Sequence, residues 1–130
     1  MKKTVALILL LFCTVGFSAC GKQVSPIQLP AAESLVSVHI SSDGTTKTYT
    51  DTTWMQELLS TLSAAQPTSR ESVQDYPDAA HPMQIIFEHQ DGGTSTVFAY
   101  EKNGAYYLEQ PYQGIYRLTA AQYNWLVQTE

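Results

Sequence analysis

Residues 83–118 read MQIIFEHQDGGTSTVFAYEKNGAYYLEQPYQGIYRL, a series of short β-prone runs separated by turn signals. Three strands are predicted, at Met83–His89, Thr94–Glu101 and Ala105–Gln110. The turns between them contain Asp91-Gly92-Gly93 and Asn103-Gly104, and Asn and Gly both tolerate the positive φ of a tight hairpin. After a break at Pro111–Gly114, Ile115–Leu118 adds a short fourth strand. The stretch therefore predicts an antiparallel meander.

A hairpin precedes this meander. Ser34–Ser41 alternates in polarity, and Val36, Val38 and Ile40 form its apolar side. Asp43-Gly44 is a turn signal, and Thr45–Tyr49 is a Thr-rich, β-prone run that follows it. The two runs predict a first pair of antiparallel strands.

Two segments have the period of a helix. In Asp51–Ala65 the apolar stripe consists of Trp54, Leu58, Leu59, Leu62 and Ala65. Three residues are candidates for its N-cap. Thr53 has capping-box spacing to Gln56, and Asp51 and Thr52 are the alternatives. Thr119 and Gln122 have capping-box spacing and open a last helix. The order ββ-α-βββ(β)-α predicts an α+β fold, an antiparallel β-meander with two helices.

The first 20 residues are typical of an export signal. Lys2 and Lys3 precede an apolar run of about 13 residues, too short for a bilayer span of about 20. Phe17-Ser18-Ala19-Cys20 resembles the lipobox of bacterial lipoproteins, in which the cysteine receives a diacylglycerol. The alternative is ordinary cleavage after Ala19, leaving a free Cys20. We expect a signal peptide at 1–19, a lipidated tether at 20–32 and a single domain at 33–130.

Charge and cysteine content fit an exported domain. Loss of Lys2 and Lys3 leaves five basic against twelve acidic residues, a net charge of −7. Nucleic-acid binders carry basic patches, so we expect no nucleic-acid partner. Cys13 leaves with the signal, and Cys20 then remains without a disulfide partner. The expected location is the extracytoplasmic face of the cell membrane, to which the diacylglycerol on Cys20 anchors the chain.

No motif in the sequence indicates catalysis. The three histidines, His39, His81 and His89, lack the spacing of a metal site. Asp75 and Asp78 flank Tyr76-Pro77 in a long loop at Pro67–Pro82, where they bind Ca²⁺, take part in acid–base chemistry or only shape the loop. We expect no enzyme activity, no metal and no cofactor.

Tyrosine is concentrated in the last third of the chain. Tyr and Trp combine a large ring with a polar group and are favoured at binding surfaces, although they also build cores. Pro111 and Gly114 bracket a turn in which Tyr112 either protrudes or lies buried at a strand-switching corner. The candidate binding residues are Asp75, Tyr76, Glu109, Gln110, Tyr112, Gln113 and Tyr116.

Two motifs carry a resemblance to a known family. YYLEQPYQGIY at 106–116 and SVQDYP at 72–77 resemble a domain-of-unknown-function family of small secreted proteins and lipoproteins from Gram-positive bacteria. The resemblance spans residues 34–126. It implies a small α+β domain and an extracytoplasmic location, and it assigns no catalytic residue.

Three functions remain open. The first is a non-enzymatic interaction or sensory module that binds an envelope or membrane protein through the aromatic corner QPYQGIY at 110–116 and the loop at 72–77. The second is capture of a small ligand or peptide in a tyrosine-lined pocket. The third is inhibition of, or immunity to, an extracytoplasmic enzyme, since an acidic domain suits a basic target.

Overall fold

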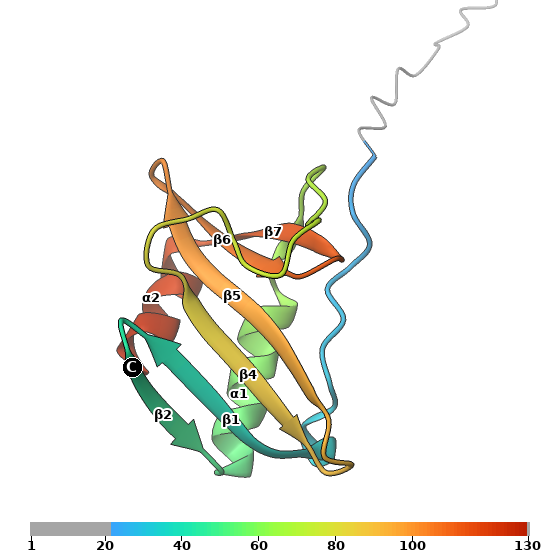
Figure 1. Ribbon diagram of the computed structural model, residues 1–130, viewed down its shortest axis with the longest axis vertical. Helices are drawn as coiled ribbons and strands as arrows, with labels where there is room; N and C mark the ends of the chain where they lie inside the picture. Colours follow the sequence, from blue (N-terminus) through green and yellow to red (C-terminus); the bar gives the residue numbers. More distant parts are fainter. Residues whose placement is uncertain (1–21, 130) are drawn as a thin grey trace, which may run out of the picture.

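The computed structural model describes residues 22–129 and is α+β, as predicted. The chain forms one antiparallel sheet of seven strands, ordered β2-β1-β4-β5-β6-β7-β3, and the helices α1 and α2 lie behind it in Figure 1. The elements are η1 (Ala32–Ser34), β1 (Leu35–Ser42), β2 (Thr45–Tyr49), α1 (Thr52–Ser63), β3 (Gln66–Pro67), β4 (Met83–His89), β5 (Thr94–Lys102), β6 (Ala105–Gln110), β7 (Gly114–Leu118) and α2 (Ala120–Gln128). The short elements η1 and β3 have no counterpart in the predicted order.

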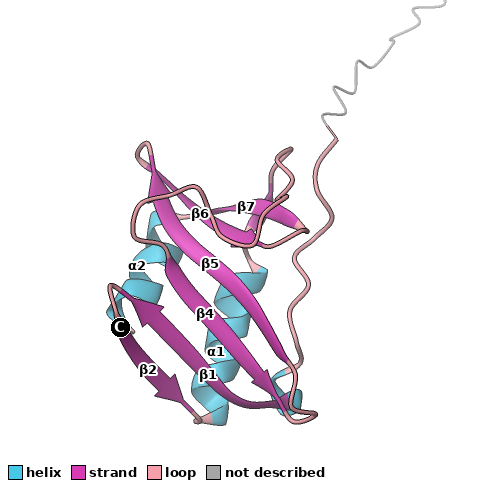
Figure 2. Cartoon of the chain, in the orientation of Figure 1, coloured by secondary structure: helices cyan, strands magenta, loops and turns pink. Residues whose placement is uncertain are grey.

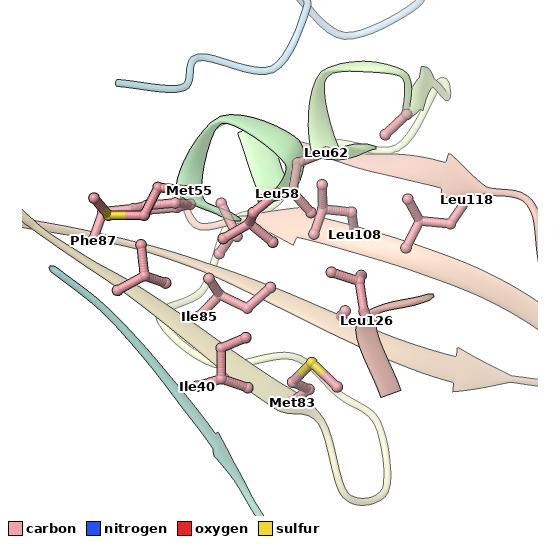
Figure 3. Packing of buried hydrophobic residues seen from close by; sticks show 14 of the residues in the cluster. Ile40, Met55, Leu58, Leu62, Met83, Ile85, Phe87, Leu108, Leu118 and Leu126 are labelled. Atoms are coloured by element: carbon pink, nitrogen blue, oxygen red, sulfur yellow. The ribbon is translucent and has the colours of Figure 1, made fainter. Parts of the chain in front are cut away.

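The core lies between the sheet and the two helices (Figure 3). Alternate residues of the central strands supply one side of it, including Ile85, Val97 and Leu108, and the helices supply Leu58 and Leu126. Further buried members are Val38, Ile40, Met55, Leu62, Met83, Phe87, Ala99, Tyr116 and Leu118. No helix of the described chain is long and apolar enough to cross a bilayer.

Side-chain caps fix where both helices begin. The Asp51 carboxylate accepts a hydrogen bond of 2.7 Å from the Trp54 backbone N–H, so Asp51 is the N-cap of α1. Thr119 and Gln122 form the predicted capping box of α2, in which each side chain bonds the other residue's backbone N–H.

The predicted apolar side of β1 is wrong at one position. The register of β1 against β4 shifts between Leu35 and Ser37, which marks a β-bulge. The bulge leaves Val36 exposed, whereas Leu35 is buried with Val38. Strict alternation cannot anticipate this shift.

The long loop covers the second face of the sheet. Residues 68–82 cross in front of β5, β6 and β7 (Figure 2), on the side away from the helices. Phe98 and Tyr100 of β5 point to this side, because Val97 and Ala99 belong to the core. Both rings are buried, so the sheet buries apolar surface on two sides in this region.

The N-terminal segment, residues 22–31, packs along the domain. The Val24 N–H donates to the Thr68 carbonyl at 2.9 Å, and the side chains of Val24, Ile27 and Leu29 lie against the core. Residues 20–32 are predicted as a tether, with the domain starting at 33. The described part of that segment is instead held against the domain. Residues 1–19 and Cys20 lie outside the described residues.

A truncation measures what this packing contributes. A chain that begins at Ala32 lacks three half-buried apolar side chains, Val24, Ile27 and Leu29, that a chain beginning at Lys22 contains. Each half-buried side chain contributes less to stability than a fully buried one, so the three together contribute about 2–4 kcal/mol. We expect the shorter chain to be less stable by this amount in urea unfolding monitored by tryptophan fluorescence. Equal midpoints for the two chains would show that the segment is a free tether.

Candidate functional site

A buried carboxylate fastens the long loop to the sheet. Glu109 of β6 is 1% exposed and points to the loop-covered face. Its Oε1 accepts a hydrogen bond of 2.7 Å from the Ser72 hydroxyl, and its Oε2 accepts one of 3.0 Å from the Tyr100 hydroxyl. A buried charge needs such donors, and bonds to charged groups are stronger than neutral ones. Glu109 therefore holds the loop at Ser72.

The same network acts on Tyr100. Burial raises the pKa of the Tyr100 hydroxyl well above its ordinary value, and the charge of Glu109 and the hydrogen bond to it raise this pKa further. Tyr100 therefore stays protonated and keeps donating to the carboxylate at alkaline pH.

The β6–β7 turn presents Tyr112 to solvent. The Gln113 N–H donates to the Gln110 carbonyl at 3.0 Å and closes the turn. Tyr112 has φ of 59°, a left-handed conformation that is unfavourable for a residue with a Cβ, and its side chain is 66% exposed. Strained residues of this kind cluster at functional sites. Of the two sequence-based alternatives for Tyr112, the structure agrees with protrusion.

The loop and the turn meet at Asp75. A hydrogen bond from the Tyr112 hydroxyl to the Asp75 carboxylate, with the nearby negative charge, raises the pKa of Tyr112. Tyr76 is 57% exposed and packs edge-on against Phe98, with ring centroids 5.0 Å apart. Three predicted residues, Asp75, Tyr76 and Tyr112, thus lie on one side of the domain.

Val73 joins them as a residue that the sequence did not single out. It is 75% exposed, and Val73, Tyr76 and Tyr112 are three of the five exposed large hydrophobic residues of the described chain. An irregular loop has no periodicity, so no sequence pattern indicates that this valine is outside. We call Val73, Asp75, Tyr76 and Tyr112 the loop–corner surface.

The other predicted residues serve the interior. Glu109 and Tyr116 are buried, so they are wrong as direct contacts for a partner. The Tyr116 hydroxyl donates to the Ser25 carbonyl at 2.6 Å, and burial raises its pKa while a hydrogen bond with Gln113 opposes the rise. Gln110 exchanges two hydrogen bonds with the Gln28 backbone, of 2.9 and 2.6 Å. Gln110 and Tyr116 therefore support the N-terminal segment directly.

The two loop aspartates do not converge on a metal site. Asp75 bonds Tyr112, whereas Asp78 lies 3.3 Å from the Lys102 ammonium. Within residues 22–129, no three His, Cys, Asp or Glu side chains are grouped as a metal would require.

A polar cluster lies on β1 and β4. The Ser37 hydroxyl (2.7 Å) and His39 Nε2 (3.2 Å) share one oxygen of Glu88, and these bonds lower the pKa of the Glu88 carboxyl. A catalytic triad instead places the carboxylate on the imidazole nitrogen opposite the serine. In this cluster the other ring nitrogen, Nδ1, faces Thr48 at 2.9 Å. The arrangement is that of a hydrogen-bonded surface network.

One cavity of the described residues lies outside the loop–corner surface. It has a volume of about 310 Å³ and lies at the β1–β2 hairpin, lined by Ile40, Ser42, Asp43, Thr45 and Lys47. No tyrosine is among these lining residues, so the cavity does not match the predicted tyrosine-lined pocket.

A family model, described as Domain of unknown function (DUF5300) and labelled DUF5301, matches residues 23–117. The chain belongs to this family. The match confirms the resemblance to a family of unknown function, and it includes most of the N-terminal segment. The DUF5301 domain is also similar to the NMR structure of a protein from Ruminococcus gnavus, with 36% identity and a TM-score of 0.65. That alignment covers 75% of this chain and 99% of the other. No curated protein matches the chain.

Replacing Tyr100 with phenylalanine tests the buried network. At neutral pH we expect the free energy of unfolding to fall by about 1–3 kcal/mol, because one buried oxygen of Glu109 loses its hydrogen-bond donor. The pKa of Tyr100 is higher in the folded protein than in the unfolded chain, so ionisation of the unfolded tyrosine above about pH 10 favours the unfolded state. The wild type therefore loses the stability that Tyr100 contributes as the pH rises above this value. The difference in urea midpoint between wild type and Tyr100→Phe should therefore shrink from about pH 8 to about pH 11. A difference independent of pH would contradict the assignment.

Proposed function

We propose that this DUF5301 protein is a lipid-anchored, extracytoplasmic interaction module without enzyme activity. It binds a protein of the membrane or envelope through the loop–corner surface. The observation that carries the proposal is the grouping of three exposed apolar side chains, Val73, Tyr76 and Tyr112, on a loop and turn fixed to the sheet.

The physical properties of the surface support protein recognition. Tyrosine is enriched at the centres of interfaces, and exposed apolar groups with a polar rim mark binding sites. Asp75 supplies a charged hydrogen-bond acceptor beside Tyr112. The hydrogen bond between Glu109 and Ser72 orders the loop before binding, so less conformational entropy is lost on association.

Capture of a small ligand is less well supported. The cavity at the β1–β2 hairpin is at the lower limit of the 300–1,000 Å³ typical of ligand sites. No tyrosine lines it, and the neighbouring cavity that Tyr76 does line, which shares Ser42 and Asp43 with it, has a volume of only about 120 Å³. An inhibitor or immunity role would use the same loop–corner surface, and the identity of the partner would separate it from other interaction roles.

Membrane attachment is proposed from the sequence alone. Cys20 follows an apolar run and two small residues, and two acyl chains on a diacylglycerol give stable anchoring where one chain does not. The anchor keeps the acidic domain near membrane proteins and away from bulk solution.

Two cysteine substitutions test the anchor in the native cell. We expect Cys20→Ser to abolish incorporation of a palmitate analogue, because the acceptor thiol is gone, whereas Cys13→Ser in the apolar run should leave incorporation unchanged. In-gel fluorescence of the labelled protein gives the result. Full labelling of Cys20→Ser would refute lipidation at this residue.

Photo-crosslinking tests the interaction surface. A photoreactive amino acid at position 73 or 112, in membranes of the native cell, should capture one reproducible protein, and the same probe at position 36 should not. Val36 is a matched control because it is also an exposed valine but lies on the bulge of β1.

Binding of the captured protein is then measured with the purified chain from Lys22. Tyr112→Ala and Tyr76→Ala should each weaken it about tenfold or more, as substitutions at binding hot spots do, and Val36→Ser should change it little. Unchanged affinity in both tyrosine variants would remove the assignment of this surface.

A further inference from the structure

The N-terminal segment and the loop–corner surface are tied to the same place in the fold. Val24 packs on Gly114 so tightly that a Cβ at position 114 would lie 2.6 Å from its methyl group. The side chain of Gln110, just before the turn that carries Tyr112, accepts a hydrogen bond from the Gln28 N–H and donates one to the Gln28 carbonyl. The chain therefore enters the domain at the β6–β7 turn.

The length of chain before this clamp is short. Cys20 precedes Val24 by four residues, which span at most about 14 Å when fully extended. A free tether over residues 20–32 would instead allow about 45 Å. The segment enters beside β7 (Figure 1), whereas the β5–β6 turn lies at the opposite end of the antiparallel strands. The six residues of β6, which separate the β5–β6 turn from the β6–β7 turn, measure about 20 Å.

We infer that the clamp holds the lipoprotein with its β6–β7 turn toward the bilayer. The partner is then an integral membrane protein, bound at the extracytoplasmic segment where its chain leaves the membrane. The inference rests on the proposed function and names its partner class. A soluble or wall-bound partner would need no such orientation.

The lipid surface itself is a less suitable partner for the loop–corner surface than a membrane protein is. The mature chain has a net charge of −7, and Glu71 and Asp75 are exposed on the loop. Anionic headgroups repel such a surface. A protein segment can instead place apolar side chains against Val73 and Tyr112 and a donor or basic group against Asp75.

Energy transfer from the domain to the bilayer tests the orientation. The mature chain has no cysteine except the acylated Cys20, so Gln113→Cys and Glu101→Cys each give one labelling site in the full lipoprotein, and Glu101 is exposed beside the β5–β6 turn. In vesicles containing acceptor lipid, we expect transfer from position 113 to be at least twice that from position 101. Equal transfer from the two sites would overturn the orientation.

An insertion tests whether the partner needs this proximity. Ten Gly/Ser residues placed between Gly21 and Lys22 leave the clamp intact but extend the reach of the tether by up to about 35 Å. We expect this variant to show equal energy transfer from the two sites and at least fivefold less crosslinking of the partner through position 112.

The outcomes separate the two claims. If the insertion leaves crosslinking unchanged, the membrane-protein inference fails while the interaction module stands. If neither form crosslinks any partner, the proposed function fails even where the energy transfer shows the expected orientation. Binding of the chain from Lys22 to protein-free anionic vesicles, lost in Tyr112→Ala, would identify the lipid surface as the occupant and overturn the inference.

Discussion

Two adjacent residues near the end of β6 hold both of the long segments that lack regular structure. Successive side chains of a strand point to opposite faces, so Glu109 faces the long loop and Gln110 faces the N-terminal segment. Glu109 binds Ser72, and Gln110 binds the Gln28 backbone. This pair therefore helps to hold both the loop that covers the second face of the sheet and the segment through which the chain enters.

The arrangement explains why a small domain can display apolar side chains on an irregular loop. The loop is fixed at Ser72 by a buried carboxylate and at Tyr76 by the Phe98 ring, so the residues between them have little freedom. Ordered apolar groups of this kind bind a partner at lower entropic cost than flexible ones do. The left-handed backbone at Tyr112 has the same effect on the neighbouring turn.

The fold was largely predictable because its signals are local. Turn dipeptides, capping residues and alternating runs specify the hairpins and both helices. The bulge at Val36 and the packing of residues 22–31 depend on contacts distant in the sequence and were not predicted. For the candidate site, composition indicated the tyrosines. Only the fold shows that Tyr76 and Tyr112 are exposed, that Glu109 and Tyr116 are buried, and that Val73 joins the exposed group.

Backbone hydrogen exchange measured by NMR tests most directly whether the β6–β7 region holds both segments. In the chain from Lys22, the Val24 N–H bonds Thr68, the Gln28 N–H bonds Gln110 and the Ile115 N–H bonds Arg70. These three amides should exchange at least about a hundredfold more slowly than in an unstructured chain. Exchange of Val24 and Gln28 at unstructured rates, beside a protected Ile115, would show that the N-terminal segment is free and would contradict the account.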